Sequence, residues 1–377
     1  MSRSNNRSFV STTRLYTIFF GCVVLGLFLF SCSSMPPLKH ELQLEEMNAP
    51  KPRYSMVFII HGDGEYLYHD SRGAAHRADE KAVVTARIVA ERNLQAEVFI
   101  FHQKRRRHAM LFFPRRDGEF YYYRHGKLLA RESYWRNRGV LRFDPEVMLY
   151  RRFHAQDQDQ LLKLFLYFGH EIPEFAGTGY DASYKNRRFT VRDLASGLKS
   201  FTSDSSKFDL IVLSTCNNGT PYTIAELSPY TRTIIASPDN LHLSYLDIRP
   251  LEELEIGLND GDVPAFARQF AHQAFGRLTQ DIQTAITVAV YDAEHVQGYL
   301  NAVANAYHQA LIILQGQKQG AAERCDCATI PQYTLPGMSA GVDVFYRPPR
   351  FGRQKHNRIH SGWECWKLPE QSSDQDL

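Results

Sequence analysis

Six short runs of apolar residues recur along the chain, and they constrain the fold more than any other feature. Each run holds four or five residues and is dominated by Ile, Val, Leu and Phe. The runs are 56–60, 97–101, 164–168, 210–213, 233–236 and 286–290. Continuous apolar runs of this length are typical of strands that are buried on both faces, as in a parallel sheet.

Apolar residues at helical spacing fill several of the gaps between these runs. The predicted helices span 79–93, 190–201, 263–278 and 296–314. Thr190 stands where its side-chain oxygen would cap the second of them. Strands that alternate with helices predict an α/β fold with a doubly wound, mostly parallel six-stranded sheet and flanking helices.

One segment departs from this alternation. Between 109 and 142, aromatic runs are separated by Asp117-Gly118 and His125-Gly126. Asp-Gly between apolar runs is a hairpin signal, so we expect a small antiparallel β insertion over about 104–143 of a domain that spans 54–314. The remaining segment, 315–377, is rich in Pro, Gly and Arg and is predicted to be a loop-rich C-terminal cover.

The first 31 residues have the pattern of an export signal. Three arginines precede an apolar run of 16 residues, 15–30, which is short for a membrane span of about 20 residues but typical of a signal peptide. The run ends in Leu29-Phe30-Ser31-Cys32, which resembles a bacterial lipobox. The resemblance implies cleavage before Cys32 and a lipid on its thiol; the alternative is an uncleaved signal anchor. Residues 32–53, with several prolines, are predicted to be a tether.

Both interpretations place the folded part outside the cytoplasm. We therefore expect a protein that is exported to the bacterial cell envelope, on its periplasmic or outer-membrane side, and held at the membrane by lipid on Cys32. The chain has 44 basic and 41 acidic residues, and its three excess charges all lie in the signal peptide. A balanced folded part argues against a nucleic acid as partner.

Three cysteines lie near the C-terminus, and an oxidising compartment lets them pair. Either Cys325 or Cys327 is expected to form a disulfide with Cys365. A zinc site is the rival, but a C-x-C pair with one distant cysteine is a weak zinc pattern. No calcium-loop motif of the D-x-D-x-D-G type occurs either, so we predict neither a metal nor a cofactor.

Three chemically capable side chains follow predicted strands. His61 follows the first run, His170 follows the third and Cys216 follows the fourth. Ligands of an open parallel sheet bind beyond the carboxyl ends of its strands. A thiol and an imidazole at neighbouring strand ends can act as nucleophile and base, with nearby backbone N–H groups holding the oxyanion.

The layout resembles the clostripain-like family of cysteine peptidases, which have a caspase-type fold. That family shows one apolar block that ends in His and a second that ends in Cys. The matching blocks here are 164–170 and 210–216, and shorter matches lie at Asp144-Pro145-Glu146-Val147, Gly179-Tyr180-Asp181, 190–199, Glu226-Leu227 and Ile235-Ala236-Ser237. The similarity covers roughly residues 54–250.

The resemblance implies that Cys216 is the nucleophile and His170 the general base and acid. In the caspase-type strand order (second, first, third, fourth), His61 would lie roughly 10 Å to the side, given about 4.8 Å between strands. His61 is therefore expected to line the cleft, and Gly169 and Glu171, which flank His170, are expected at the oxyanion site.

Two residues depart from the family pattern. Glu171 stands where the family has a glycine whose backbone approaches the substrate carbonyl, and Ser214 stands where it has an aspartate that binds a basic side chain. A preference for Arg or Lys is therefore not carried over. Asp239 and Asp247, after the fifth run, are candidate substitutes that would bind substrate together with Ser214.

These observations predict a cysteine endopeptidase that hydrolyses peptide bonds of peptide or protein substrates through a thioester acyl-enzyme. Because of Glu171 and Ser214, a second hypothesis stays open, namely a catalytically inactive envelope lipoprotein that binds peptides or protein partners. A third is a hydrolase of another acyl bond.

Overall fold

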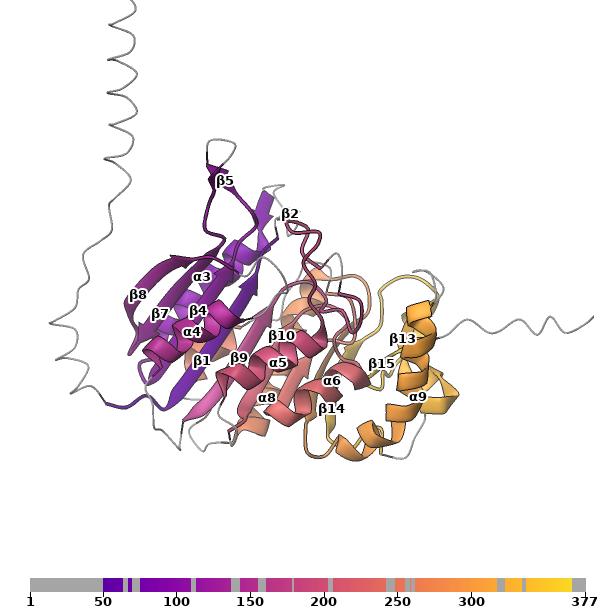
Figure 1. Cartoon of the computed structure of the whole chain (residues 1–377). Coiled ribbons are helices and arrows are strands. Elements are labelled where there is room, and N and C mark those ends of the chain that lie inside the picture. Colours follow the sequence, from indigo (N-terminus) through magenta and orange to yellow (C-terminus); the bar gives the residue numbers. More distant parts are fainter. Residues whose placement is uncertain are drawn as a thin grey trace, which may run out of the picture. The chain divides into compact units, whose positions relative to one another are not determined.

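A mixed sheet of nine strands runs through the residues that the structure describes (Figure 1). The structure is a computed structural model, and it describes residues 50–63, 67–69, 75–109, 113–136, 143–154, 161–177, 180–202, 206–241, 248–254, 258, 262–316, 323–333 and 337–367. In order across the sheet, the strands are β14 (Val342–Arg347), β12 (Ile286–Asp292), β11 (Thr231–Ala236), β10 (Phe208–Ser214), β9 (Leu162–Phe168), β1 (Tyr54–His61), β4 (Ala96–Gln103), β7 (Gly118–Arg124) and β8 (Lys127–Tyr134).

The five central strands, from β11 to β4, are parallel, and antiparallel strands extend both edges. The α/β fold class is therefore confirmed, each predicted run lies in a strand, and β4, β1, β9 and β10 follow the expected order. The predicted count of six strands is wrong. The aromatic hairpin β7–β8 joins the sheet edge instead of standing apart, because Phe120 and Tyr122 are buried in the core when β7 pairs with β4.

Alternate residues of each strand face opposite layers of helices. Met56 and Phe58 of β1 pack on the side of α3 (Ala78–Arg92) and α8 (Val263–Asp281). Val57 and Ile59 pack on the other side, which α4 (Asp144–Phe153), α5 (Val191–Phe201), α6 (Pro221–Leu227) and α9 (Gln297–Gly316) cover. Figure 1 shows α4, α5 and α6 side by side across this face. This two-sided burial is why the strands read as continuous apolar runs.

The local signals at helix ends also act as expected. Thr190 Oγ1 accepts a hydrogen bond from the Asp193 backbone N–H, and the Asp193 side chain accepts from the Thr190 N–H, which completes a capping box at the start of α5.

Short elements complete the described fold. Three two-stranded ribbons pair β2 (Leu67–His69) with β3 (Ala75–Arg77), β5 (His108–Ala109) with β6 (Phe113–Pro114), and β13 (Glu323–Asp326) with β15 (Glu364–Lys367). Single 3₁₀ turns span Ser228–Tyr230, Arg249–Glu253, Cys327–Thr329, Pro331–Tyr333 and Arg353–His356. The segment predicted as a loop-rich cover thus supplies both a strand of the main sheet, β14, and the two-stranded β13–β15 ribbon.

The described residues from Lys51 onward belong to one compact unit. The predicted signal peptide, Cys32 and all of the predicted tether before Pro50 lie outside the described residues. Within the described ranges, none of the helices has both the length and the apolar character that crossing a bilayer requires.

Candidate active site

Cys216 and His170 lie at the same edge of the sheet, beyond the carboxyl ends of two adjacent parallel strands. Ser214 of β10 is paired in register with Phe168 of β9, and each candidate residue follows its strand by two positions. The Gly169 N–H donates to the Ser214 carbonyl at 3.3 Å, which keeps the chains together past the last register pair. Neighbouring strands are about 4.8 Å apart, so the topology brings the two side chains to one place.

Asp63 orients the imidazole of His170. The His170 Nε2 atom lies 2.9 Å from Asp63 Oδ2, and the same oxygen accepts the backbone N–H of Ala182 at 3.2 Å. The Asp63 side chain is 1% exposed, whereas the imidazole is one-third exposed. A buried carboxylate thus fixes a ring that remains open to solvent. Asp63 comes from the loop after β1, which is the neighbour of β9 on the side away from Cys216.

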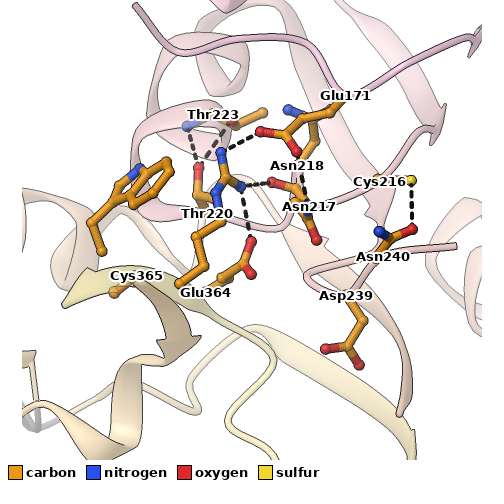
Figure 2. A network of polar contacts seen from close by, with 12 residues as sticks. Glu171, Cys216, Asn217, Asn218, Thr220, Thr223, Asp239, Asn240, Glu364 and Cys365 are labelled. Carbon is orange, nitrogen blue, oxygen red and sulfur yellow. Dashed lines mark hydrogen bonds and ion pairs between the residues drawn. The ribbon is translucent and has the colours of Figure 1, made fainter. Parts of the chain in front are cut away.

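The sulfur of Cys216 lies between the loops that follow β10 and β11. Its thiol donates to Asn240 Oδ1 at 3.3 Å, and the Leu241 backbone N–H donates to the sulfur at the same distance. Figure 2 shows the Cys216 sulfur directed at Asn240. The residue is partly exposed. Asn217 follows with a φ of 49°, a left-handed conformation that Asn tolerates better than most residues and that turns the chain sharply after the thiol.

Side-chain amides join the loop after His170 to the loop after Cys216. The buried Asn218 amide donates to the Ile172 carbonyl at 2.9 Å and accepts the Ile172 N–H at 3.0 Å, as a neighbouring strand would. Asn217 Nδ2 donates to Glu171 Oε2 at 2.8 Å. The relative position of the two candidate residues is therefore held by their own loops as well as by the sheet.

Glu171 turns its carboxylate away from the thiol. Figure 2 shows the carboxylate on the side of Asn217 opposite to the Cys216 sulfur. It forms an ion pair with Arg324 of β13 and accepts from Asn217. Burial raises the pKa of Glu171, while the Arg324 guanidinium acts in the opposite direction. The Glu171 carboxylate is thus held by Arg324 and Asn217, on the side of Asn217 that faces away from the thiol.

His61 is fully buried, which corrects the expectation that it lines the cleft. Its Nε2 atom lies 3.1 Å from Asp181 Oδ2, and its ring stacks on Tyr180 with 4.7 Å between centroids. Burial lowers the pKa of His61. The His61 and His170 rings are 6.5 Å apart, so His61 packs behind the imidazole instead of facing substrate. The sequence run Ile-Ile-His does not reveal this, because the strand continues through His61.

The proposed substrate-binding residues are only partly brought together. Ser214 is the last residue of β10 and is 7% exposed. Asp239 accepts from Thr287 Oγ1 at 2.5 Å and lines a hollow of about 370 Å³ that also includes Asn240, the partner of Cys216. Arg353 lines the same hollow. Asp247 lies outside the described residues.

Of the three C-terminal cysteines, two form a disulfide and one is a free thiol. Cys327 is bonded to Cys365, with 4.9 Å between the Cα atoms, and Cys325 is free. Across the described ranges, no group of three or more His, Cys, Asp and Glu side chains is arranged to hold a metal ion.

Comparisons with known proteins bear on the fold. The sequence matches no protein-family model, and no curated protein is similar enough to count as a match. Among solved structures, an inactive zymogen C11 protease from Parabacteroides distasonis is 12% identical, with a TM-score of 0.56 over 85% of this chain and 93% of that one. A secreted C11 cysteine protease from Bacteroides thetaiotaomicron, solved with an irreversible peptide inhibitor, is 12% identical, with a TM-score of 0.53 over 86% and 94%. The chain therefore has the caspase-like α/β fold of the C11, or clostripain-like, cysteine proteases.

Proposed function

We propose that the protein is a cysteine endopeptidase in which Cys216, His170 and Asp63 act together. The observation that carries the proposal is the pairing of the His170 imidazole with a buried carboxylate, at the register position that matches Cys216 on the next strand. A nucleophile, a base and a group that orients the base are the parts that covalent acyl transfer needs. The peptide inhibitor in one structure of the same fold supports a peptide as the substrate.

The first half of the reaction forms a thioester. With Nε2 engaged by Asp63, Nδ1 of His170 would take the proton from the Cys216 thiol. The Leu241 N–H that donates to the sulfur stabilises the thiolate as it forms. The thiolate attacks the scissile carbonyl, backbone N–H groups of the two loops stabilise the oxyanion, and the imidazolium returns its proton to the departing amine.

The second half regenerates the thiol. His170 removes a proton from a water molecule, and the resulting hydroxide attacks the thioester carbonyl. The C–S bond breaks, the imidazolium protonates the sulfur, and the new carboxylate leaves. Asp63 stays ionised throughout and stabilises each imidazolium, as an orienting carboxylate does in a triad.

Substrate contacts belong to the same proposal. The hollow beside Asn240 is the candidate site for the side chain that precedes the scissile bond, with Asp239 as one of its walls. A second hollow of about 460 Å³ is lined by Trp135, which follows β8, and by Tyr184 and Lys185, which lie in the loop whose Ala182 contacts Asp63. We propose that an extended peptide uses both hollows.

The experiment combines cleavage of a peptide library with thiol labelling. Cys325 is the other free thiol among the described residues, and Cys22 and Cys32 lie outside them, so a Cys325→Ser protein in which Cys22 and Cys32 are also serine restricts labelling by iodoacetamide to Cys216. In that background, Cys216→Ala should abolish cleavage, and His170→Ala should reduce both cleavage and the labelling rate of Cys216. A Cys216→Ala protein that still cleaves peptides would refute the assignment. Slow labelling that is equal with and without His170 would favour the inactive, peptide-binding alternative, and product analysis would reveal another acyl bond.

We also propose that the protein is exported and anchored in the bacterial envelope by lipid on Cys32. The proposal rests on the sequence pattern of residues 1–32. Cells grown with an alkyne-bearing fatty acid should label the wild-type protein and not Cys32→Ala. A wild-type protein that takes up no label and keeps residues 1–31 would favour the uncleaved signal anchor.

A further inference from the structure

An arginine of the β13–β15 ribbon contacts both loops of the proposed active site. Arg324 of β13 lies 153 positions after Glu171 and 107 after Asn217, yet its guanidinium contacts both. Its Nη2 pairs with the Glu171 carboxylate, and its Nη1 donates to the Asn217 carbonyl at 2.8 Å. These are the residues that directly follow His170 and Cys216.

We propose that Arg324 is a positioning residue for the proposed peptidase: it keeps the Glu171 carboxylate away from the reacting groups and fixes the turn that presents the Cys216 thiol. The proposal rests on the proposed function. Arg324 would then allow this chain to carry a glutamate beside the imidazole that is expected to act as base.

The β13–β15 ribbon holds Arg324 rigidly enough to position the two loops. Its side chain is 14% exposed, and the guanidinium carbon lies 4.3 Å from the ring centroid of Trp366, its partner in register on β15. Trp366 Nε1 donates in turn to Glu174 at 3.2 Å. The disulfide between Cys327 and Cys365 ties the turn that follows β13 to β15. A stacked and bonded arginine loses little freedom when it pairs with a carboxylate.

The charge balance makes Glu171 the main anionic partner of Arg324. Glu364 of β15 also accepts from Arg324, at 2.9 Å. The attraction of the Glu171 carboxylate is the largest charge effect that raises the pKa of Arg324, and that of Glu364 comes second. The arginine's charge therefore acts mainly on Glu171.

Removing Arg324 would leave Glu171 without its countercharge. An unpaired carboxylate next to a proposed oxyanion site opposes the negative charge that develops on the substrate carbonyl. The Asn217 carbonyl would lose its donor as well, which loosens the left-handed turn after Cys216. Both effects act on the transition state more than on peptide binding.

The test is a double-variant cycle on the full chain with a cleaved peptide substrate. Arg324→Met keeps an unbranched apolar stem and removes the guanidinium, with both its charge and its contact with Trp366; it should lower kcat about tenfold or more with little change in KM. In a Glu171→Gln background, Arg324→Met should lower kcat much less than it does in the wild type, because the carboxylate that needs the countercharge is gone. Arg324→Lys should restore part of the lost rate, because an ammonium keeps the charge without the two-pronged geometry.

Arg347 offers a matched control. It is also an arginine of the C-terminal segment, and it donates to the backbone carbonyls of Ile282 and Thr284 at 2.6 and 3.1 Å. Arg347→Met should affect the melting temperature without the change in kcat. If Arg324→Met matches this control in kcat, or if it lowers kcat equally in the wild type and in the Glu171→Gln background, Arg324 has no positioning role.

Labelling of Cys216 separates this result from a failure of the proposed function. In the background in which Cys22, Cys32 and Cys325 are serine, the iodoacetamide rate of Cys216 should depend on His170 and fall in Arg324→Met. Dependence on His170 without dependence on Arg324 overturns the positioning role alone. Absence of any dependence on His170 overturns the proposed peptidase, and with it the role of Arg324.

Discussion

Replacing Asp63 tests whether the buried carboxylate works as the orienting group of the proposed triad. One oxygen, Oδ2, accepts both the His170 ring N–H and the Ala182 backbone N–H. In Asp63→Asn the amide oxygen can take that position and accept both bonds, so the geometry is kept and the charge is lost. Asp63→Ala removes the acceptor altogether.

The structure sets the expected size of each loss. A hydrogen bond to a charged group contributes about 1.5–3 kcal/mol, and a neutral one about 0.5–1.5. Asp63→Asn should therefore cost about 1–1.5 kcal/mol of transition-state stabilisation, or roughly a tenfold fall in kcat/KM, since 1.4 kcal/mol is a factor of ten. By the same conversion, Asp63→Ala should lower kcat/KM roughly 10- to 150-fold.

The assay is the initial rate of peptide cleavage, together with the melting temperature of each variant. Glu97→Gln is the matched control. Glu97 is a fully buried carboxylate that also contacts a partly exposed imidazole, that of His154, but it lies at the start of β4, the opposite end of the sheet from the proposed site. Asp63 is not the orienting group if Asp63→Asn retains the wild-type kcat/KM, or if Glu97→Gln loses activity to the same extent at equal stability.

Two further predictions concern the β13–β15 ribbon and its disulfide. Because burial raises the pKa of Glu364 from 4.5 to about 8, the folded protein keeps a proton that the unfolded chain loses in that interval, and stability falls as the pH rises through it. In Glu364→Gln, urea unfolding should show a smaller loss of stability between about pH 5 and about pH 9, and an equal loss contradicts the assignment. The disulfide closes a separation of 38 residues. On the chain-entropy model, replacing Cys327 and Cys365 by serine should therefore lower the free energy of unfolding by about 4 kcal/mol. A variant as stable as the oxidised wild type would contradict this prediction.

The central part of the fold is predictable because burial on both faces leaves a strong mark in the sequence. The strands β1, β4, β9, β10, β11 and β12 each contain a predominantly apolar run. β14 does not, because it lies at the sheet edge and its residues are only half-buried. The aromatic hairpin was predicted, but its place in the sheet depends on which edge strand is free to accept it, and local sequence carries no such information.

The residues of the candidate site are likewise only partly predictable from the sequence. His170 and Cys216 are recognisable because each ends an apolar run. Asp63 is not, since its role depends on β1 lying beside β9; the only local signal is its position two residues after His61 at the end of the first run. The choice of Cys327 over Cys325 is equally hidden. Cys325 is the residue in register with Cys365, yet the bond forms with the cysteine that begins the following turn.

The glutamate beside His170 illustrates why a departure from a family pattern does not by itself indicate an inactive protein. A carboxylate at position 171 would oppose oxyanion formation if it faced the thiol, and that is the sense in which the sequence argues against activity. In the structure the same carboxylate is neutralised by an arginine that no local motif connects to it. The effect of Glu171 is therefore expected to depend on Arg324, so a variant that removes Arg324 should be compared with one that removes both residues. A chain that keeps this glutamate but lacks the arginine is the one that we expect to have lost catalysis.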